Sequence, residues 1–166
     1  MKKFLLMLVI AVALIIGGVY LFVGDPVVTY NNRKLEMALI NETDETITFN
    51  KLAEFEWDEM YSFKHTMTKA DIEGVLGFES NAIKEPSSDT FIQVIFVKDG
   101  KIVANVNGVP TALGYNIIFH DNGEGYNKIL YTDAVEFEVE NIEKVMRYTE
   151  IDKGIVVPPD KQMGIY

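Results

Sequence analysis

The sequence contains no cysteine, which excludes disulfide bonds, thiolate metal sites and thiol nucleophiles. It also lacks a glycine-rich phosphate loop, a dinucleotide-binding fingerprint and a Gly-x-Ser-x-Gly motif. Nucleotide-dependent chemistry and serine-nucleophile chemistry therefore have no residues to carry them. A fold of this composition is stabilised by packing alone, and no cofactor is expected.

Positive charge is scarce, with 15 Lys and Arg residues against 25 Asp and Glu residues in a chain of 166. Residues 24–166 hold all the acidic residues but not Lys2 or Lys3, so 13 basic residues face 25 acidic ones there, a formal charge of −12. An acidic domain repels phosphate backbones and anionic lipid headgroups, so nucleic acid is not an expected partner. The negative charge is also explained without any partner, because it keeps the domain soluble.

Charge is absent altogether from Phe4 to Val23, and twenty apolar residues in a helix can cross a hydrocarbon layer of about 30 Å. Lys2 and Lys3 before this segment favour a cytoplasmic N-terminus and export of the downstream chain. A cleaved signal peptide is the alternative, but Leu21 and Phe22 stand where small residues are required. We predict a single-pass membrane protein with an extracytoplasmic C-terminal domain, or a secreted protein if the segment is cleaved.

The remaining chain has the length of one domain. We predict residues 1–23 as the anchor or signal segment, 24–32 as a tether, 33–157 as a single extracytoplasmic α+β domain and 158–166 as a tail. A helix is expected near "NNRKLEMALI", and a second begins after Thr68, where Asp71 completes a capping box and Gly77 ends the helix.

Several segments have strand patterns. Residues 91–97, "FIQVIFV", are apolar on both faces, which is typical of a central strand, and Asp99-Gly100 predicts a hairpin back along 101–106. Further strands are expected at 115–119 and 127–139, and a strand is favoured over a helix at 141–151. Together these predict a mainly antiparallel sheet, a meander of about five strands, with one or two helices packed on one face.

The run "EFEWDEMYSF", residues 54–63, contains the only tryptophan, and its period of two predicts one strand. Trp57, Tyr61 and Phe63 would then share a face and act as core anchors. Asp58 and Glu59 would point to opposite faces, which excludes them as a catalytic pair. Glu59 is the polar residue of an aromatic face. Desolvation would raise its pKa and make it an acid. The favoured alternative is a structural role, either at the rim of the strand or paired with a cation.

Three more residues are candidates for binding together with Glu59. They are His65, His120 and Asp121, which bear imidazole and carboxylate groups that a metal-dependent enzyme could use. Their spacing matches neither a helical ligand pair nor a calcium loop, so no metal site is predicted. The Asn122-Gly123 pair is explained by a turn.

Residues 52–78 resemble small, uncharacterised, membrane-anchored exported bacterial proteins that carry the motif Phe-x-Trp-Asp-x-x-Tyr-x-Phe followed by a helix ending in Leu-Gly. Phe55 to Phe63 match the motif. In that family the last Phe leads into Gly-Pro-Tyr-Thr, whereas Lys64-His65-Thr66-Met67 stands here. The resemblance covers under a fifth of the chain, implies anchoring and export, and supplies no catalytic residues.

The function that these observations favour is a non-enzymatic binding or interaction module that contacts an envelope protein. Two alternatives remain open. One is an envelope hydrolase or metal-dependent enzyme that uses Glu59, His65, His120 or Asp121, which requires these groups to converge. The other is an immunity or inhibitor protein whose acidic surface masks a basic partner. The sequence does not specify an oligomeric state.

Overall fold

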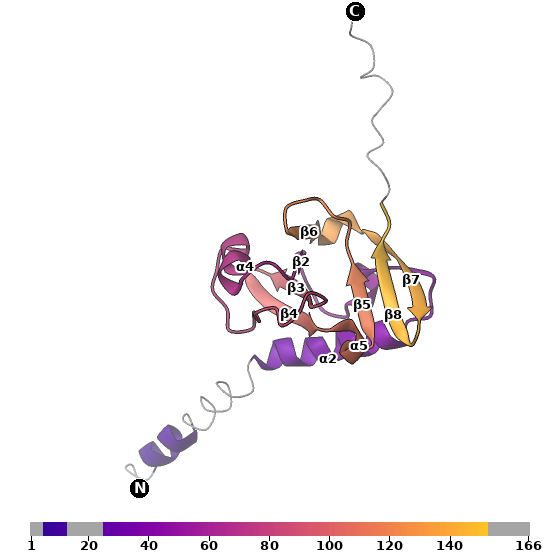
Figure 1. Cartoon of the computed structure of the whole chain (residues 1–166). Coiled ribbons are helices and arrows are strands. Elements are labelled where there is room, and N and C mark those ends of the chain that lie inside the picture. Colours follow the sequence, from indigo (N-terminus) through magenta and orange to yellow (C-terminus); the bar gives the residue numbers. More distant parts are fainter. Residues whose placement is uncertain (1–4, 13–24, 153–166) are drawn as a thin grey trace, which may run out of the picture.

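A computed structural model describes residues 5–12 and 25–152 (Figure 1). It is an α+β structure, as predicted, with short helices around two sheets. In chain order, the elements from residue 25 onward are α2 (Pro26–Asn41), β1 (Thr46–Thr48), α3 (Phe49–Leu52), β2 (Glu59–Phe63), α4 (Lys69–Leu76), β3 (Ile92–Lys98), β4 (Lys101–Gly108), α5 (Pro110–Leu113), β5 (Tyr115–Ile118), β6 (Tyr126–Leu130), the 3-10 turn η1 (Tyr131–Asp133), β7 (Glu136–Ile142) and β8 (Val145–Glu150).

The strands form two four-stranded sheets and not the single meander that the sequence predicted. Sheet A has the order β1-β7-β8-β5, and sheet B has the order β4-β3-β2-β6. All neighbours are antiparallel except β5 and β8, which are parallel. The chain passes between the sheets repeatedly. Strand β1 of sheet A pairs with β7, and β2 of sheet B pairs with β6, so each pair joins strands that are far apart in the sequence. Hairpin signals show only adjacent pairings, which is why they suggested a meander.

The main core contains residues of both sheets, with α2 and α3 contributing to it. Phe49 of α3 contacts Phe96 of β3 and also Phe137 and Tyr148 of sheet A, with ring centroids between 4.9 and 6.3 Å apart. Leu39 of α2 is fully buried in the same cluster. One continuous apolar interior therefore joins both sheets.

A second, smaller core covers the other face of sheet B. Tyr61 and Phe63 of β2 pack there with Ile95 of β3, Ile72 of α4 and Ile83 of the following loop. Strand β3 is thus buried on both faces, which confirms the prediction of a central strand. Because α2 and α4 lie over opposite faces of sheet B, the prediction that the helices share one face is wrong.

Local signals were reliable where the interaction is short-range. Thr68 and Asp71 form the predicted capping box at the start of α4, and Gly77 ends the helix in the left-handed conformation with φ of 79°. Asp99 and Gly100 make the predicted hairpin between β3 and β4, with φ of 48° and 69°. These motifs are confirmed.

Helix α2 begins at Pro26, so most of the predicted tether is helical. The Asp25 carboxylate caps its first turn by accepting a hydrogen bond from the backbone N–H of Val27. Two asparagines then bind the outer edge of β4. Asn31 donates to the carbonyl of Val103, and Asn32 bonds both the N–H and the carbonyl of Asn105. These bonds protect an edge strand that would otherwise be open to pairing.

The predicted strand over residues 127–139 is two strands in different sheets. Strand β6 belongs to sheet B and β7 to sheet A, and η1 lies between them. The Asp133 carboxylate accepts a hydrogen bond from the N–H of Leu130, and Ala134 has φ of 45°. This local bond closes the turn and redirects the chain to the other sheet.

The ambiguous segment 141–151 is a strand, as favoured, and contributes β8. Glu143 and Lys144 form its tight turn with β7, both with positive φ. Sequence patterns did not indicate this turn, because left-handed conformations are usually occupied by glycine or asparagine.

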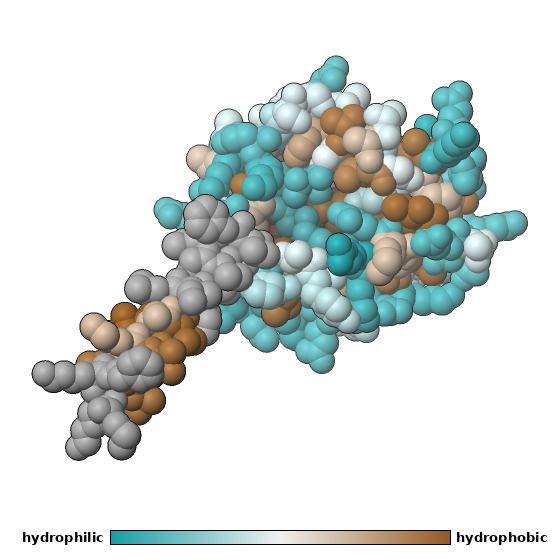
Figure 2. All heavy atoms as spheres, turned by 90° about the horizontal axis from the view of Figure 1, so that it is seen from below, coloured by the Kyte–Doolittle hydropathy of each residue, from teal (hydrophilic) through white to brown (hydrophobic). Residues whose placement is uncertain are grey.

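Most of the predicted anchor, Phe4–Val23, and the whole tail 158–166 lie outside the described residues. Residues 5–12 are helical, and their apolar side chains are exposed. They appear in brown in Figure 2, where the visible face of the folded part is mainly hydrophilic. Within residues 5–12 and 25–152, no helix combines the length and the hydrophobicity needed to cross a membrane.

Gln93 of β3 is 2% exposed, and neither end of its amide has a hydrogen-bond partner among the described residues. Its neighbours in the sheet are Phe63 and Asn107. We expect Gln93→Met to raise the free energy of unfolding by about 1 kcal/mol, because it replaces a buried unpaired amide with an apolar side chain of similar size. Urea unfolding measures this change, and a loss of stability in the variant would contradict the expectation.

Candidate functional site

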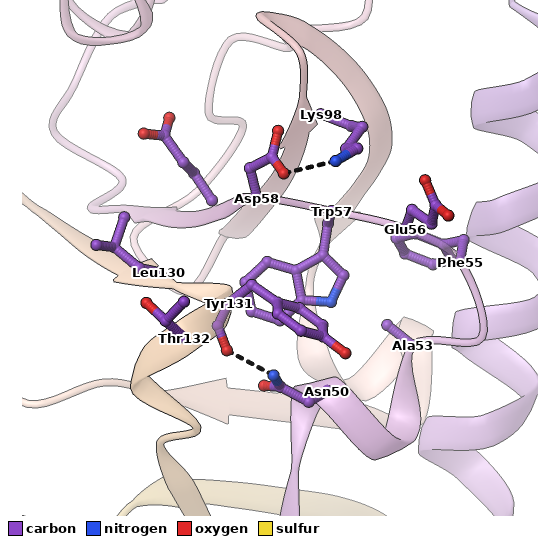
Figure 3. Close-up of a pocket in the computed structure, with 11 residues that line it drawn as sticks. Asn50, Ala53, Phe55, Glu56, Trp57, Asp58, Lys98, Leu130, Tyr131 and Thr132 are labelled. Atoms are coloured by element: carbon purple, nitrogen blue, oxygen red, sulfur yellow. Dashed lines mark hydrogen bonds and ion pairs between the residues drawn. The ribbon is translucent and has the colours of Figure 1, made fainter.

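A cleft of about 600 Å³ opens beside the "EFEWDEMYSF" run, and we call it the Trp57 cleft (Figure 3). It is bounded by α3, by the irregular segment that precedes β2, and by η1. The lining residues are Asn50, Ala53, Phe55, Glu56, Trp57, Asp58, Glu59, Lys98, Leu130, Tyr131 and Thr132.

The indole of Trp57 forms the inner wall of the cleft. Trp57 is 3% exposed. Its ring makes edge-on contacts with Phe96 on the core side and with Tyr131, at centroid distances of 5.5 and 5.1 Å. The indole N–H has no hydrogen-bond partner among the described residues. Trp57 is therefore a core anchor, as predicted, and also presents an unpaired donor next to the cleft.

Tyr131 forms part of the outer wall and is 45% exposed. The Asn50 amide of α3 donates to the backbone carbonyl of Tyr131 at 2.6 Å. Because this bond uses only the backbone of Tyr131, it holds the turn to α3 without engaging the phenol ring. Figure 3 shows the ring lying directly against the indole.

Carboxylates line the upper side of the cleft in Figure 3. Asp58 accepts a hydrogen bond from the backbone N–H of Asp99 at 2.9 Å and forms an ion pair with Lys98 at 2.8 Å, and these bonds lower its pKa. Glu56 is exposed at the same rim, and no ion pair involves it among the described residues. Acidic groups therefore outnumber cations around the opening.

Glu59 does not have the raised pKa that an acid catalyst would need. Lys128 lies 2.6 Å from one carboxylate oxygen, and the Tyr61 hydroxyl donates to the other at 2.8 Å. These bonds, the one from Lys128 first, outweigh desolvation and lower the pKa of Glu59. Glu59 is therefore paired with a cation, Lys128, as a structural role requires.

The predicted common face of residues 55–63 is only partly present. Strand β2 begins at Glu59, and the segment before it is irregular, so alternation does not extend back to Trp57. Trp57 consequently packs in the main core with Met60, whereas Tyr61 and Phe63 pack in the second core under α4. The contacts of α3 and η1, which the sequence pattern does not contain, decide this orientation.

The other predicted candidates lie at the far end of β2. Glu59 begins β2, and His65 lies in the turn that follows Phe63 at its other end, so the length of the strand, about 13 Å, separates the two positions. Lys64 binds Asp121 at 2.7 Å, so the turn that contains His65 contacts the loop that contains Asp121. His120 lies in the same loop, with its ring 4.0 Å from Asp152.

The structure therefore separates Glu59 from His65 and Asp121, and the convergence that an enzyme using all of them requires is absent. No cluster of three or more potential metal ligands occurs in residues 5–12 and 25–152. Sequence patterns missed Asn50, Glu56 and Tyr131. The turn that contains Tyr131 did have a signal in the sequence. Thr132-Asp133 is a polar pair that interrupts the expected strand over residues 127–139.

Comparisons of the chain with family models, with curated proteins and with solved structures found no match. The geometry of the cleft is accordingly the basis for a functional proposal.

The ion pair of Glu59 predicts a pH-dependent contribution to stability. Because folding lowers its pKa, the stabilisation is present above the ordinary value of about 4.5 and is lost as the pH falls through the lowered pKa. We expect Glu59→Gln to reduce the free energy of unfolding by less than about 1 kcal/mol at pH 7, since both side chains are partly solvated. Urea unfolding at pH 7 and pH 3 should show the difference shrinking at the lower pH.

Glu143→Gln, in the exposed turn between β7 and β8, is the matched control. It removes the same charge without this ion pair. An equal pH-dependent effect in both variants would attribute the result to net charge and would contradict a specific role for the Glu59–Lys128 pair.

Proposed function

We propose that this protein is a single-pass, membrane-anchored extracytoplasmic module that binds another protein of the cell envelope through the Trp57 cleft. The observation that carries the binding proposal is the combination of a buried aromatic wall, an exposed tyrosine and an acidic rim at one opening. Trp and Tyr dominate the energetics of protein interfaces because they bury a large area at low conformational cost.

The anchoring part of the proposal rests on the uncharged segment from Phe4 to Val23 and on Lys2 and Lys3 before it. The exposed apolar side chains of residues 5–12 fit a lipid environment better than water. The folded part starts at Pro26, so it would lie close to the membrane surface.

Recognition through the cleft is favoured over strand addition at either edge of sheet B. Asn31 and Asn32 occupy the edge of β4. At the opposite edge of sheet B, Asn122 donates to the carbonyl of Tyr126, and Asp133 accepts from the N–H of Leu130. The short edge of β6 is thus bound by side chains at both ends, which leaves little room for a partner strand.

Topology is tested by a reporter fused after Tyr166 of the full chain. We expect activity from a reporter that works only outside the cytoplasm and none from one that works only inside, because the lysines retain the N-terminus in the cytoplasm. Activity of the cytoplasmic reporter alone would overturn the proposed localisation.

Binding is tested by a photoreactive amino acid placed at Tyr131 of the full chain in intact cells. We expect one defined crosslinked protein, identified by mass spectrometry, from this position and not from Glu143, which is exposed on the distant β7–β8 turn. The adduct should weaken when Leu130 at the rim is replaced by aspartate. No adduct, or the same products from both positions, would contradict the cleft as the binding site.

A further inference from the structure

We propose that the Trp57 cleft recognises a lysine or arginine side chain of the partner, holding the cation at the Glu56 carboxylate of the acidic rim while the Trp57 indole N–H donates to a neighbouring peptide carbonyl. This inference rests on the proposed function of the cleft as a binding site and names the chemistry of what it binds.

The acidic rim supplies the first part of the site. Glu56, Asp58 and Glu59 line the cleft, whereas Lys98 is the only lysine in its lining. Even when Lys128 beyond the lining is counted, carboxylates outnumber cations. Glu56 is exposed and has no ion pair among the described residues, so its carboxylate can pair with an incoming cation. Asp58 is already paired with Lys98 and adds only to the negative charge of the rim. The charge of −12 on residues 24–166 would also accelerate the approach of a basic segment.

The indole N–H supplies the second part. A buried N–H without an acceptor is unfavourable, and the folded protein provides none for Trp57 within the described residues. A peptide carbonyl from a bound segment would satisfy it. Since a lysine or arginine side chain has donors only, the acceptor must come from the backbone beside it. The ligand therefore has to be a peptide segment and not a free amine.

Tyr131 gives access to this donor and adds a third contact. Its ring lies against the indole in Figure 3, while its turn is held to Asn50 through the backbone alone. Rotation of the ring would open the indole N–H to the cleft without releasing the turn. The face of the displaced ring would then be available for a cation–π contact with the bound side chain.

The unique tryptophan makes a direct experiment possible, because fluorescence of the chain at tryptophan wavelengths reports only on the cleft. The full chain, kept in detergent micelles, would be titrated with acetyl-Gly-Lys-Gly-amide and its arginine counterpart. The matched probe is the norleucine peptide, which has a similar side chain without the charge. We expect the basic peptides to bind at least ten times more tightly than the norleucine peptide and to weaken as salt is raised.

Two variants separate the contacts. Glu56→Gln should weaken binding of the lysine peptide about two- to fivefold, as expected for an exposed ion pair. Trp57→Phe, measured by calorimetry because the fluorophore is lost, should weaken both the lysine and the norleucine peptides about five- to tenfold, because the carbonyl contact is common to them. Glu143→Gln should leave both affinities unchanged. Thermal unfolding of each variant verifies that the fold is retained.

Equal affinity for the lysine and norleucine peptides would overturn the cation site. An equal loss of lysine-peptide affinity in Glu56→Gln and Glu143→Gln would show that only the net charge of the protein attracts the peptide. This result would also overturn the cation site. An unchanged affinity in Trp57→Phe would remove the carbonyl contact. If no peptide binds while Tyr131 still crosslinks a partner in cells, this inference fails and the proposed function stands. Without the crosslink, the proposed function fails too.

Discussion

The contacts of Phe49 hold the two sheets of this protein together. The ring sits on the one-turn helix α3 and touches Phe96 of sheet B as well as Phe137 and Tyr148 of sheet A. Neither sheet has a complete core of its own on this side, because each leaves one apolar face toward the other. Burial of these rings removes a large apolar area from water and fixes how the sheets meet.

The Trp57 cleft follows from the same arrangement. Asn50, the next residue in α3, ties the turn after β6 to the helix, and this turn places Tyr131 against the indole. Phe96 contacts both Phe49 and Trp57, so the wall of the cleft is an extension of the main core. The inner side of the cleft is thus part of the packed core, whereas Tyr131 at its outer side is 45% exposed.

Two of the carboxylates that line the cleft are paired with lysines. Lys98 and Lys128 pair with Asp58 and Glu59 and lower the pKa values of both carboxyls, so these groups stay ionised near neutral pH. A carboxyl that acts as a general acid at neutral pH is favoured by a raised pKa, which neither group has. The observed shifts favour a permanently negative rim.

The sequence by itself determined the features that depend on neighbouring residues. The capping box of Thr68, the hairpin at Asp99-Gly100 and the double-faced burial of β3 were all predicted, because each is set by bonds or alternation within a few residues. The α+β class followed from the mixture of these signals. The buried position of Trp57 was also predicted, although its packing partners were not.

Tertiary structure decided everything that depends on distant pairings. The break at Ala134 sends the chain from sheet B to sheet A, and no periodic pattern announces which sheet a strand joins. The sequence grouped Trp57 with Tyr61, but contacts with Phe96 and Tyr131 draw the indole into the other core. Asn50 and Tyr131 are 81 residues apart, and only the fold brings them together. The cleft could not be predicted because its walls come from segments that meet only when both sheets close over one core.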